Sequence, residues 1–373
     1  LEEALLDEGV DFLFGCLPTD IVRGSSGRPA GFVMANRHGR QAVLGKTIID
    51  ATRRGSLARM AGAGFAAYPS GRRTFRRVVI GGKMQDGPDM KGRKLPAPVC
   101  QGTEQYPAFE YTLNIDMEDG SYRSFARAEQ VARNRTFHPG QVDASDRLFQ
   151  VPPDHLHAKT PCRDDWSAAE NVPLGCLRAD GVDGLYVLGG CADMTREAAE
   201  KALRPAALIT LGRRLGARCA DETASVSVPS GVRVRRQAAD EPAASGDVEE
   251  ELGGPRPVSP SLPTIPSSQG ALPVLGSYDV VVIGGGTSGA PAAISAARHG
   301  AKTLVADFQH GLGGAGTLGL IGSYYHGNRV GFTKEIDRGT ESVGADVHVI
   351  GKAEWYRRAL RDAGADVWFG VLT

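Results

Sequence analysis

Residues 279–307 read DVVVIGGGTSGAPAAISAARHGAKTLVAD. The opening run, residues 279–283, is rich in β-branched residues and too short for a helix, so it predicts a strand buried on both faces of a parallel sheet. Ala290, Ala293, Ile294 and Ala297 then recur at helical spacing, and their small size suits close packing on the strands. Residues 303–306 predict a second strand that ends at Asp307. The order strand, glycine turn, helix, strand and acid is that of a dinucleotide-binding unit.

Gly284, Gly286 and Gly289 give the turn the spacing G-x-G-x-x-G. The first glycine permits a tight turn, the second lets the backbone approach a pyrophosphate, and the third lets the helix pack close to the sheet. Free N–H groups at the helix N-terminus then face the phosphates. Asp307 follows Gly289 by 18 residues, where an acid accepts hydrogen bonds from ribose hydroxyls. A glycine turn in another strand–helix–strand fold is the alternative.

The first residues of the chain resemble the last. Residues 4–15, ALLDEGVDFLFG, align with residues 359–370, ALRDAGADVWFG, at a constant offset of 355, and seven of the twelve positions are identical. So long a period excludes a solenoid. We interpret the chain as a slice through a tandem pair of large modules, each cut in the same helix-to-strand element. Chance similarity between two amphipathic helix–strand pairs is the alternative.

Composition limits the classes of function. The 373 residues predict two or three domains. Lys plus Arg equals Asp plus Glu at 43 each, and the short arginine runs at 72–77 and 133–135 predict solvated faces, so we expect no nucleic-acid partner. The sequence has no apolar run of 18 residues, so we expect no membrane partner. Six cysteines without a CxxC pair favour a reduced, cytoplasmic location, and the composition indicates no oligomeric state.

Residues 220–272 differ in composition from the rest of the chain, because Pro, Ser and acidic residues replace aromatic ones. Such a segment buries too little apolar surface to offset its chain entropy, so it predicts an at least partly disordered linker. We assign residues 1–219 to the C-terminal part of a first module and residues 273–373 to the dinucleotide-binding start of a second. We expect the two parts to complete each other as a circular permutation; incomplete modules that stay apart are the alternative. Before the linker, partial alternation predicts strands at residues 31–35, 41–50 and 111–117.

Three other segments carry a family resemblance. Residues 46–52, KTIIDAT, resemble the strand ending in Ala-Thr-Gly that two-dinucleotide-binding-domain flavoproteins place near the cofactor. Residues 184–198, GLYVLGGCADMTREA, resemble the late flavin-contacting strand and helix of those proteins, with the spacing of the FAD-dependent oxidoreductase family. Residues 311–317 resemble the glycine-rich loop that wraps the cofactor.

The resemblance implies an α/β protein with a three-layer, Rossmann-like FAD-binding domain on a parallel sheet, and a mixed α+β cap or substrate domain. It implies FAD as the cofactor and an enzyme that oxidises or reduces an unidentified small organic molecule by hydride transfer. The cofactor contacts predicted from the glycine turn and the resemblance are Gly284, Gly285, Gly286, Ser288, Gly289, Asp307, Gly313, Gly314, Thr317, Ala51, Thr52, Gly189 and Asp193.

Four positions depart from the family pattern. Arg53 replaces the glycine that follows Ala-Thr, and a second arginine, Arg54, comes next. Gly190 and Arg196 stand where arginine and histidine are common. The two arginines favour an alternative function, a degenerate, non-catalytic interaction module that keeps the fold but not the cofactor.

Few residues point to the substrate. His326 is a candidate acid or base and Arg329 a candidate anion clamp, and the alternative is that His326 caps a turn. His155 and His157 lie between prolines, which indicates a loop, and no third ligand is evident, so we expect no metal site. Cys191 beside a glycine turn indicates small-residue packing rather than a redox role.

Overall fold

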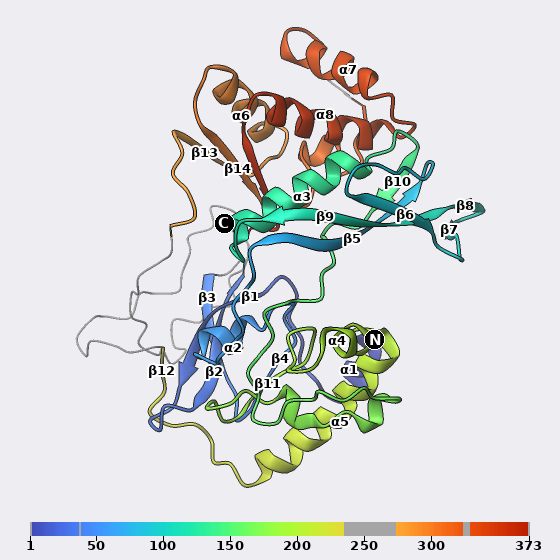
Figure 1. The fold of residues 1–373 in the computed structure, drawn as a ribbon. Helices are drawn as coiled ribbons and strands as arrows, with labels where there is room; N and C mark the ends of the chain where they lie inside the picture. Colours follow the sequence, from blue (N-terminus) through green and yellow to red (C-terminus); the bar gives the residue numbers. More distant parts are fainter. Residues whose placement is uncertain (1, 37–38, 235–273, 324–328, 372–373) are drawn as a thin grey trace. The chain divides into compact units, whose positions relative to one another are not determined.

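The computed structural model of the chain describes most of its residues (Figure 1). Within that part, no helix is long and apolar enough to cross a membrane. The predicted linker lies largely outside it, so the disorder of the linker stays a prediction. The described residues are 2–36, 39–234, 274–323 and 329–371.

The chain forms two compact units, each made from two stretches that are distant in sequence. Unit 1 consists of residues 1–68 and 151–272, and unit 2 of residues 69–150 and 273–373. In unit 2, stretches from both sides of the predicted linker therefore share one fold. The division of the chain into two tandem modules stays a prediction.

Unit 1 contains a four-stranded antiparallel sheet in the order β12-β1-β2-β3, and a separate parallel pair, β4 and β11. The strand predicted at residues 31–35 is confirmed as β2, whereas residues 41–50 form two strands, β3 and β4. Its elements are α1 (Glu2–Asp7), β1 (Leu17–Arg23), β2 (Pro29–Asn36), β3 (Gly39–Leu44), β4 (Ile48–Asp50), α2 (Ser56–Met60), β11 (Leu185–Val187), α4 (Arg196–Ala202), α5 (Pro205–Ala224) and β12 (Arg233–Val234).

Unit 2 combines an antiparallel sheet in the order β10-β5-β9-β6, the hairpin β7–β8, and a parallel sheet in the order β13-β14-β15. The strand predicted at residues 111–117 is confirmed as the end of β9. Its elements are β5 (Gly71–Gly81), β6 (Met90–Lys94), β7 (Val99–Gln101), β8 (Glu104–Tyr106), β9 (Ala108–Met117), α3 (Tyr122–Thr136), β10 (Gln141–Ala144), β13 (Val280–Ile283), α6 (Gly289–Arg298), β14 (Thr303–Asp307), α7 (Phe332–Val343), α8 (His348–Asp362) and β15 (Asp366–Phe369).

Helices cover both faces of the parallel sheet in unit 2 (Figure 1). On one face, Val305 of β14 and Phe369 of β15 pack in one core with residues of α6, α7 and α8. On the other face, Leu304 and Trp368 pack against Ala126 of α3. Most strand pairs of the molecule are nevertheless antiparallel, so the fold is mixed α/β and the complete three-layer Rossmann-like domain stays a proposal.

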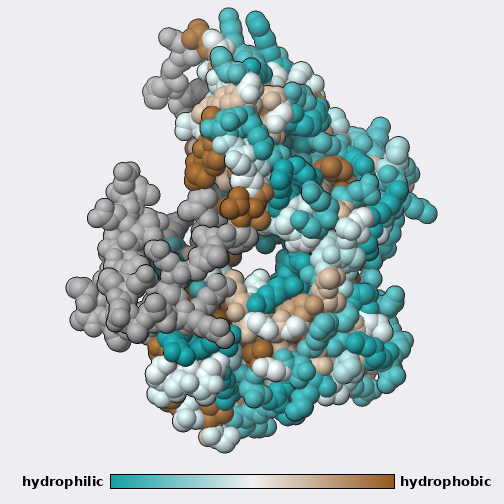
Figure 2. All heavy atoms as spheres, turned by 60° about the vertical axis from the view of Figure 1, so that its left-hand side comes forward, coloured by the Kyte–Doolittle hydropathy of each residue, from teal (hydrophilic) through white to brown (hydrophobic). Residues whose placement is uncertain are grey.

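The prediction that the first strand of this unit is buried on both faces is wrong. Among the described strands, β13 pairs with β14 alone and lies at the edge of the three-stranded sheet. Val281 and Ile283 are 51% and 58% exposed, and apolar side chains reach the surface in several patches of the face shown in Figure 2. The expectation assumed a strand in the middle of a sheet, where both faces and both edges are covered.

Two other predictions differ from the structure. Arg77 in β5 was expected on a solvated face, but it is buried, and its Nη1 donates to the Thr136 hydroxyl at 3.0 Å. Its neighbours in β5 alternate inward and outward, and this position faces inward. At the boundary of the predicted linker, α5 continues to Ala224 and β12 pairs with β1, so residues 220–224 and 233–234 have regular structure.

Candidate functional site

In the glycine turn between β13 and α6, the fold itself requires two of the three predicted glycines. Gly284 adopts φ 85°, a conformation that side chains disfavour. A Cβ at Gly289 would lie 1.8 Å from the carbonyl oxygen of Gly284, so only glycine fits there. A Cβ at Gly286 would meet no atom of the described residues within 4 Å. Gly286 therefore faces open space, while its neighbours serve the fold.

Helix α6 begins directly at this turn. Its buried residues, Ala290, Ala293, Ile294 and Ala297, are those predicted to face the sheet. Ser288 is the N-cap residue, so the backbone N–H groups of the first turn lie at the mouth of the turn. The N–H of Ala290 donates to the carbonyl of Gly286 at 3.1 Å and Pro291 has no N–H, and the helix N-terminus carries the positive end of the dipole, which suits an anion.

Asp307 lies at the end of β14, as predicted, and its carboxylate faces the glycine turn. Its Oδ2 accepts from the backbone N–H of Gly285 at 2.5 Å, and its Oδ1 accepts from the N–H of Gln309 at 2.7 Å. Each carboxylate oxygen has two lone pairs, so each retains capacity for one more donor. Ribose hydroxyls are donors of the required kind.

The glycine-rich loop after β14 packs onto the same turn. The N–H of Gly313 donates to the carbonyl of Gly285 at 2.9 Å, and the hydroxyl of Thr287 donates to the carbonyl of Gly313 at 3.1 Å. A Cβ at Gly314 would lie 3.1 Å from the Cα of Gly286. The hydroxyl of Thr317 is buried and donates to a loop carbonyl. The predicted contacts from residues 284–317 therefore lie in one cluster of unit 2.

Sequence reasoning missed two residues of this cluster. Thr287 connects the turn to the loop, yet its position is an x in the glycine motif. Lys352 of α8 is only 6% exposed, and its Nζ lies 3.0 Å from the Cβ position of Gly316. A lysine on a helix is normally solvated, so burial beside a glycine loop has no signal in the sequence.

The remaining predicted cofactor contacts lie in unit 1, around the parallel pair β4–β11. Thr52 follows β4, and its hydroxyl donates to Asp50 at 2.7 Å and accepts from the N–H of Ser56 at 2.8 Å. Ala51 is exposed beside it. A Cβ at Gly189 would lie 3.8 Å from the carbonyl oxygen of Thr52. The structure therefore brings Ala51, Thr52 and Gly189 together at the ends of two neighbouring strands.

Asp193, by contrast, has its carboxylate inside unit 1. It is 3% exposed, accepts from the N–H of Ala158 at 2.8 Å, and forms an ion pair with Arg163 at 2.7 Å. His155 lies 3.4 Å from the same carboxylate. These contacts give Asp193 a role in holding the loop of residues 155–163, and its predicted contact with a cofactor is untested.

Of the two arginines that depart from the family pattern, Arg54 has a local role for its side chain. Arg54 and Arg59 both form ion pairs with Asp154, which is 1% exposed, and the guanidinium of Arg59 lies 3.8 Å from the ring centroid of Phe65. The backbone carbonyl of Arg53 accepts a hydrogen bond from the Cys191 thiol at 3.8 Å. Arg54 therefore neutralises a buried acid that is 100 residues away in sequence.

Cys191 is fully buried, and burial raises the pKa of its thiol to about 11. A thiol in that state is a poor nucleophile, which agrees with the expected packing role.

Only one of the two predicted substrate residues lies in the described part of the chain. His326 lies outside the described residues, and Arg329 is exposed. His155 and His157 lie in a loop with their ring centroids 6.1 Å apart, and no metal-binding cluster occurs among the residues that the structure describes.

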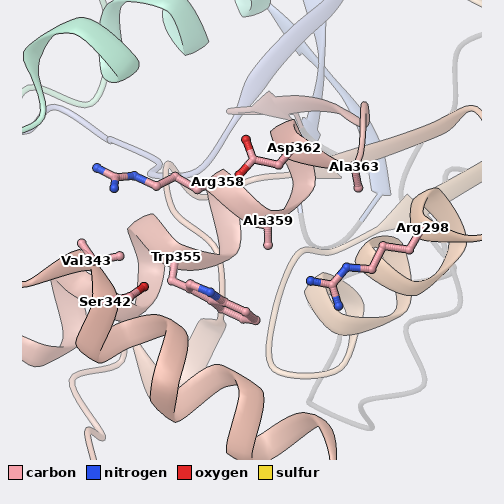
Figure 3. Close-up of a pocket in the computed structure, with 8 residues that line it drawn as sticks. All are labelled: Arg298, Ser342, Val343, Trp355, Arg358, Ala359, Asp362 and Ala363. Atoms are coloured by element: carbon pink, nitrogen blue, oxygen red, sulfur yellow. The ribbon is translucent and has the colours of Figure 1, made fainter.

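A cavity of about 330 Å³ lies among α6, α7 and α8 of unit 2 (Figure 3). Arg298 and Trp355 point into it, whereas the charged ends of Arg358 and Asp362 point away from the indole. Arg298 forms an ion pair with Glu335 at 2.6 Å. The cavity opens at the end of α6 opposite the glycine turn, so it is separate from the cluster around Gly286.

The chain matches the family described as FAD dependent oxidoreductase over residues 1–160 and 279–352. No curated protein matches it. Among solved structures, it resembles the flavin-dependent brominase Bmp2 with a TM-score of 0.36 and 12% identity, covering 61% of this chain and 55% of that one. It resembles CabE, an aromatic hydroxylase from angucycline biosynthesis, with a TM-score of 0.33 and 13% identity, covering 59% and 42%. The chain thus spans about half the length of these structures.

Proposed function

Because the chain belongs to the FAD-dependent oxidoreductase family and its cofactor is FAD, we propose that it oxidises or reduces a small organic molecule by hydride transfer. When bound, FAD supplies the electron chemistry, and the protein positions the cofactor and tunes its environment. The residues of this chain bind the cofactor, orient the substrate and move protons.

One observation carries the proposal: a Cβ at Gly286 would meet open space, whereas a Cβ at Gly285 or Gly289 would collide with the fold. Gly285 and Gly289 have no room for a Cβ, because one would meet Leu312 at 2.4 Å or Gly284 at 1.8 Å. Gly284 also has room for a Cβ, but its positive φ disfavours a side chain. Gly286 has neither constraint, and it borders free space beside the first turn of α6. A cradle with backbone N–H groups and no side chain fits a pyrophosphate.

The surrounding residues fit the rest of the nucleotide. Asp307 retains acceptor capacity for ribose hydroxyls and would repel a 2′-phosphate. Gly313, Gly314 and Thr317 hold the loop that closes over the turn. The buried Lys352 lies against that loop, with its Nζ 3.0 Å from the Cβ position of Gly316. We propose that Ala51, Thr52 and Gly189 contact the cofactor from unit 1.

The substrate side of the proposal rests on His326 and Arg329. Oxidation by hydride transfer leaves a proton on the substrate heteroatom, and an imidazole near neutrality accepts such a proton. Arg329 is exposed on the segment that follows, where a guanidinium orients a carboxylate or phosphate. Both roles are proposals.

Circular permutation of the site also remains a proposal. Gly284 belongs to unit 2 and Gly189 to unit 1, and their juxtaposition was predicted from the repeat at offset 355. Cross-linking between cysteines placed at these two segments tests it directly. A cross-link formed in high yield supports a site shared by the two parts of the chain, and none at any linker length contradicts it.

The competing function is an interaction module that keeps the fold without catalysis. A visible absorbance spectrum of the chain, incubated with FAD and then freed of unbound flavin, separates the two. Retained flavin that a two-electron reductant bleaches supports the oxidoreductase. A folded chain that retains no flavin supports the interaction module.

A further inference from the structure

The two ends of the chain have the same helix cap. Gly9 after α1 has φ 67° and Gly364 after α8 has φ 79°, and the two glycines are related by the offset of 355. Gly9 N donates to Leu6 O at 3.0 Å, and Val10 N donates to Leu5 O at 2.9 Å. The equivalent residues of α8 make the same two bonds, both at 2.9 Å. The repeat seen in the sequence is therefore also a repeat of backbone conformation.

The similarity extends past the cap to the next glycine. Gly15 and Gly370, again related by the offset, have φ 66° and 72°. In each copy five residues lie between the cap glycine and this second glycine, and in the C-terminal copy the last four of them are strand β15. In the N-terminal copy the same positions are residues 11–14, which are assigned to no strand.

The two copies differ in burial. Trp368 and Phe369 are 8% and 2% exposed, whereas the equivalent Leu13 and Phe14 are 66% and 75% exposed. The rings of Phe12 and Phe14 lie 5.3 Å apart, so alternate residues already share a side, as in a strand. The N-terminal copy thus has the apolar pattern and the flanking turns of β15, but no strand of the described part of the chain pairs with it.

We propose that residues 11–14 are the third strand of a second dinucleotide-binding unit of the same kind as residues 280–307. They would pair in parallel with the strand of that unit that corresponds to β14, in the register that joins Val305 to Val367 and Asp307 to Phe369. This inference concerns strand pairing and does not depend on FAD binding.

The equivalent positions in β15 predict which face of the sheet each side chain of residues 12–14 would cover. Phe12 and Phe14 take the places of Val367 and Phe369, which pack in the core with α6 and α8. Leu13 takes the place of Trp368, which packs on the opposite face of the sheet. In this chain the edge of β14 is already paired with β15. The strand that pairs with residues 11–14 therefore belongs to an additional dinucleotide-binding unit and not to a second copy of the whole chain.

A transplant tests whether the segment is competent as a third strand. The sequence of residues 4–15 replaces residues 359–370, which requires Arg361→Leu, Ala363→Glu, Ala365→Val, Val367→Phe and Trp368→Leu. Hydrogen exchange is measured at the amides of residues 366–369, with the single variant Trp368→Leu as the matched control for loss of the indole. Protection within about threefold of that control supports the proposal, and protection lost only in the transplant overturns it.

A fusion protein tests whether such an additional unit pairs with residues 11–14. Residues 273–355 are added before Leu1 of the full chain, because position 356 corresponds to position 1 at the offset. Amides of residues 11–14 are expected to exchange at least about tenfold more slowly than in the chain alone. Within the fusion, Phe14→Asp should abolish this protection and Phe14→Leu should keep it. Equal exchange rates in the fusion and the chain overturn the proposal.

Discussion

The carboxylate of Asp307 accepts a hydrogen bond from the backbone N–H of Gly285 at 2.5 Å, across 22 residues of sequence. The acid at the end of β14 therefore holds the glycine turn at the end of β13 before any ligand arrives. Its charge remains at the place where a nucleotide ribose would lie. We propose that this one residue connects the fold of the unit to its choice of ligand.

Cofactor choice should depend on that charge. We expect NADPH not to displace FAD from the chain, because the 2′-phosphate of NADPH would lie against the Asp307 carboxylate. A displacement titration followed by flavin fluorescence measures this. Tight NADPH binding in competition with FAD would show that Asp307 does not face the ribose.

Asp307→Asn should weaken FAD binding by about tenfold to a hundredfold, because a hydrogen bond to a charged group contributes about 1.5–3 kcal/mol. The free energy of unfolding should fall as well, since the amide is a weaker acceptor for Gly285. Asp279→Asn, on the same unit but at the start of the first strand, is the matched control. An affinity equal to that of the control contradicts the assignment.

Helices α7 and α8 touch so closely that Gly339 has no room for a side chain. A Cβ there would lie 1.8 Å from Nε1 of Trp355. Gly339→Ala should therefore destabilise the protein by about 1–3 kcal/mol through overpacking. Gly216→Ala in α5 is the control: no described atom lies within 4 Å of its Cβ position, so it should be neutral or stabilise by about 0.4–1 kcal/mol. Equal unfolding midpoints for the two variants are the contrary result.

The six thiols should react in two classes. Cys100 is exposed and Cys16 half-buried, whereas Cys162, Cys176, Cys191 and Cys219 are buried. A thiol-counting reagent at neutral pH should therefore titrate two thiols in the folded protein and all six after unfolding. Fast reaction of a third thiol in the native protein would contradict the packing assigned to Cys191.

Alkaline pH should destabilise the fold through the same thiols. Burial raises the pKa of Cys191 from 9.0 to about 11 and that of Cys176 to about 12. Between pH 9 and these values the unfolded state releases protons that the native state keeps. This contribution to stability is complete below about pH 9 and is lost as the pH rises through the folded pKa. Denaturant midpoints should fall across that window, and less so in Cys191→Ala.

Local features of the dinucleotide unit were predictable from sequence, because each depends on neighbours in the chain. The helix face of Ala290, Ala293, Ile294 and Ala297 follows from a spacing of 3.6 residues. The position of Asp307 follows from the length of the helix and the second strand. These predictions are confirmed by the structure.

Features that depend on distant residues were not predictable. The exposure of β13 depends on the absence of a second neighbour among the described strands of its sheet, which its own sequence does not reveal. The role of Arg54 depends on Asp154, 100 residues away. The burial of Lys352 depends on how α8 meets the loop at Gly316. In each case tertiary contacts decide what a local pattern leaves open.

The most direct test of the central claim is the affinity of FAD for Gly286→Val, compared with the unsubstituted chain and with Gly286→Ala. A Cβ at this position would meet no described atom within 4 Å, so the folded state should be retained with a melting temperature shifted by less than about 4 °C. The branched side chain should fill the space for the pyrophosphate, so FAD binding should fall below detection. A folded Gly286→Val that binds FAD with unchanged affinity would contradict the account.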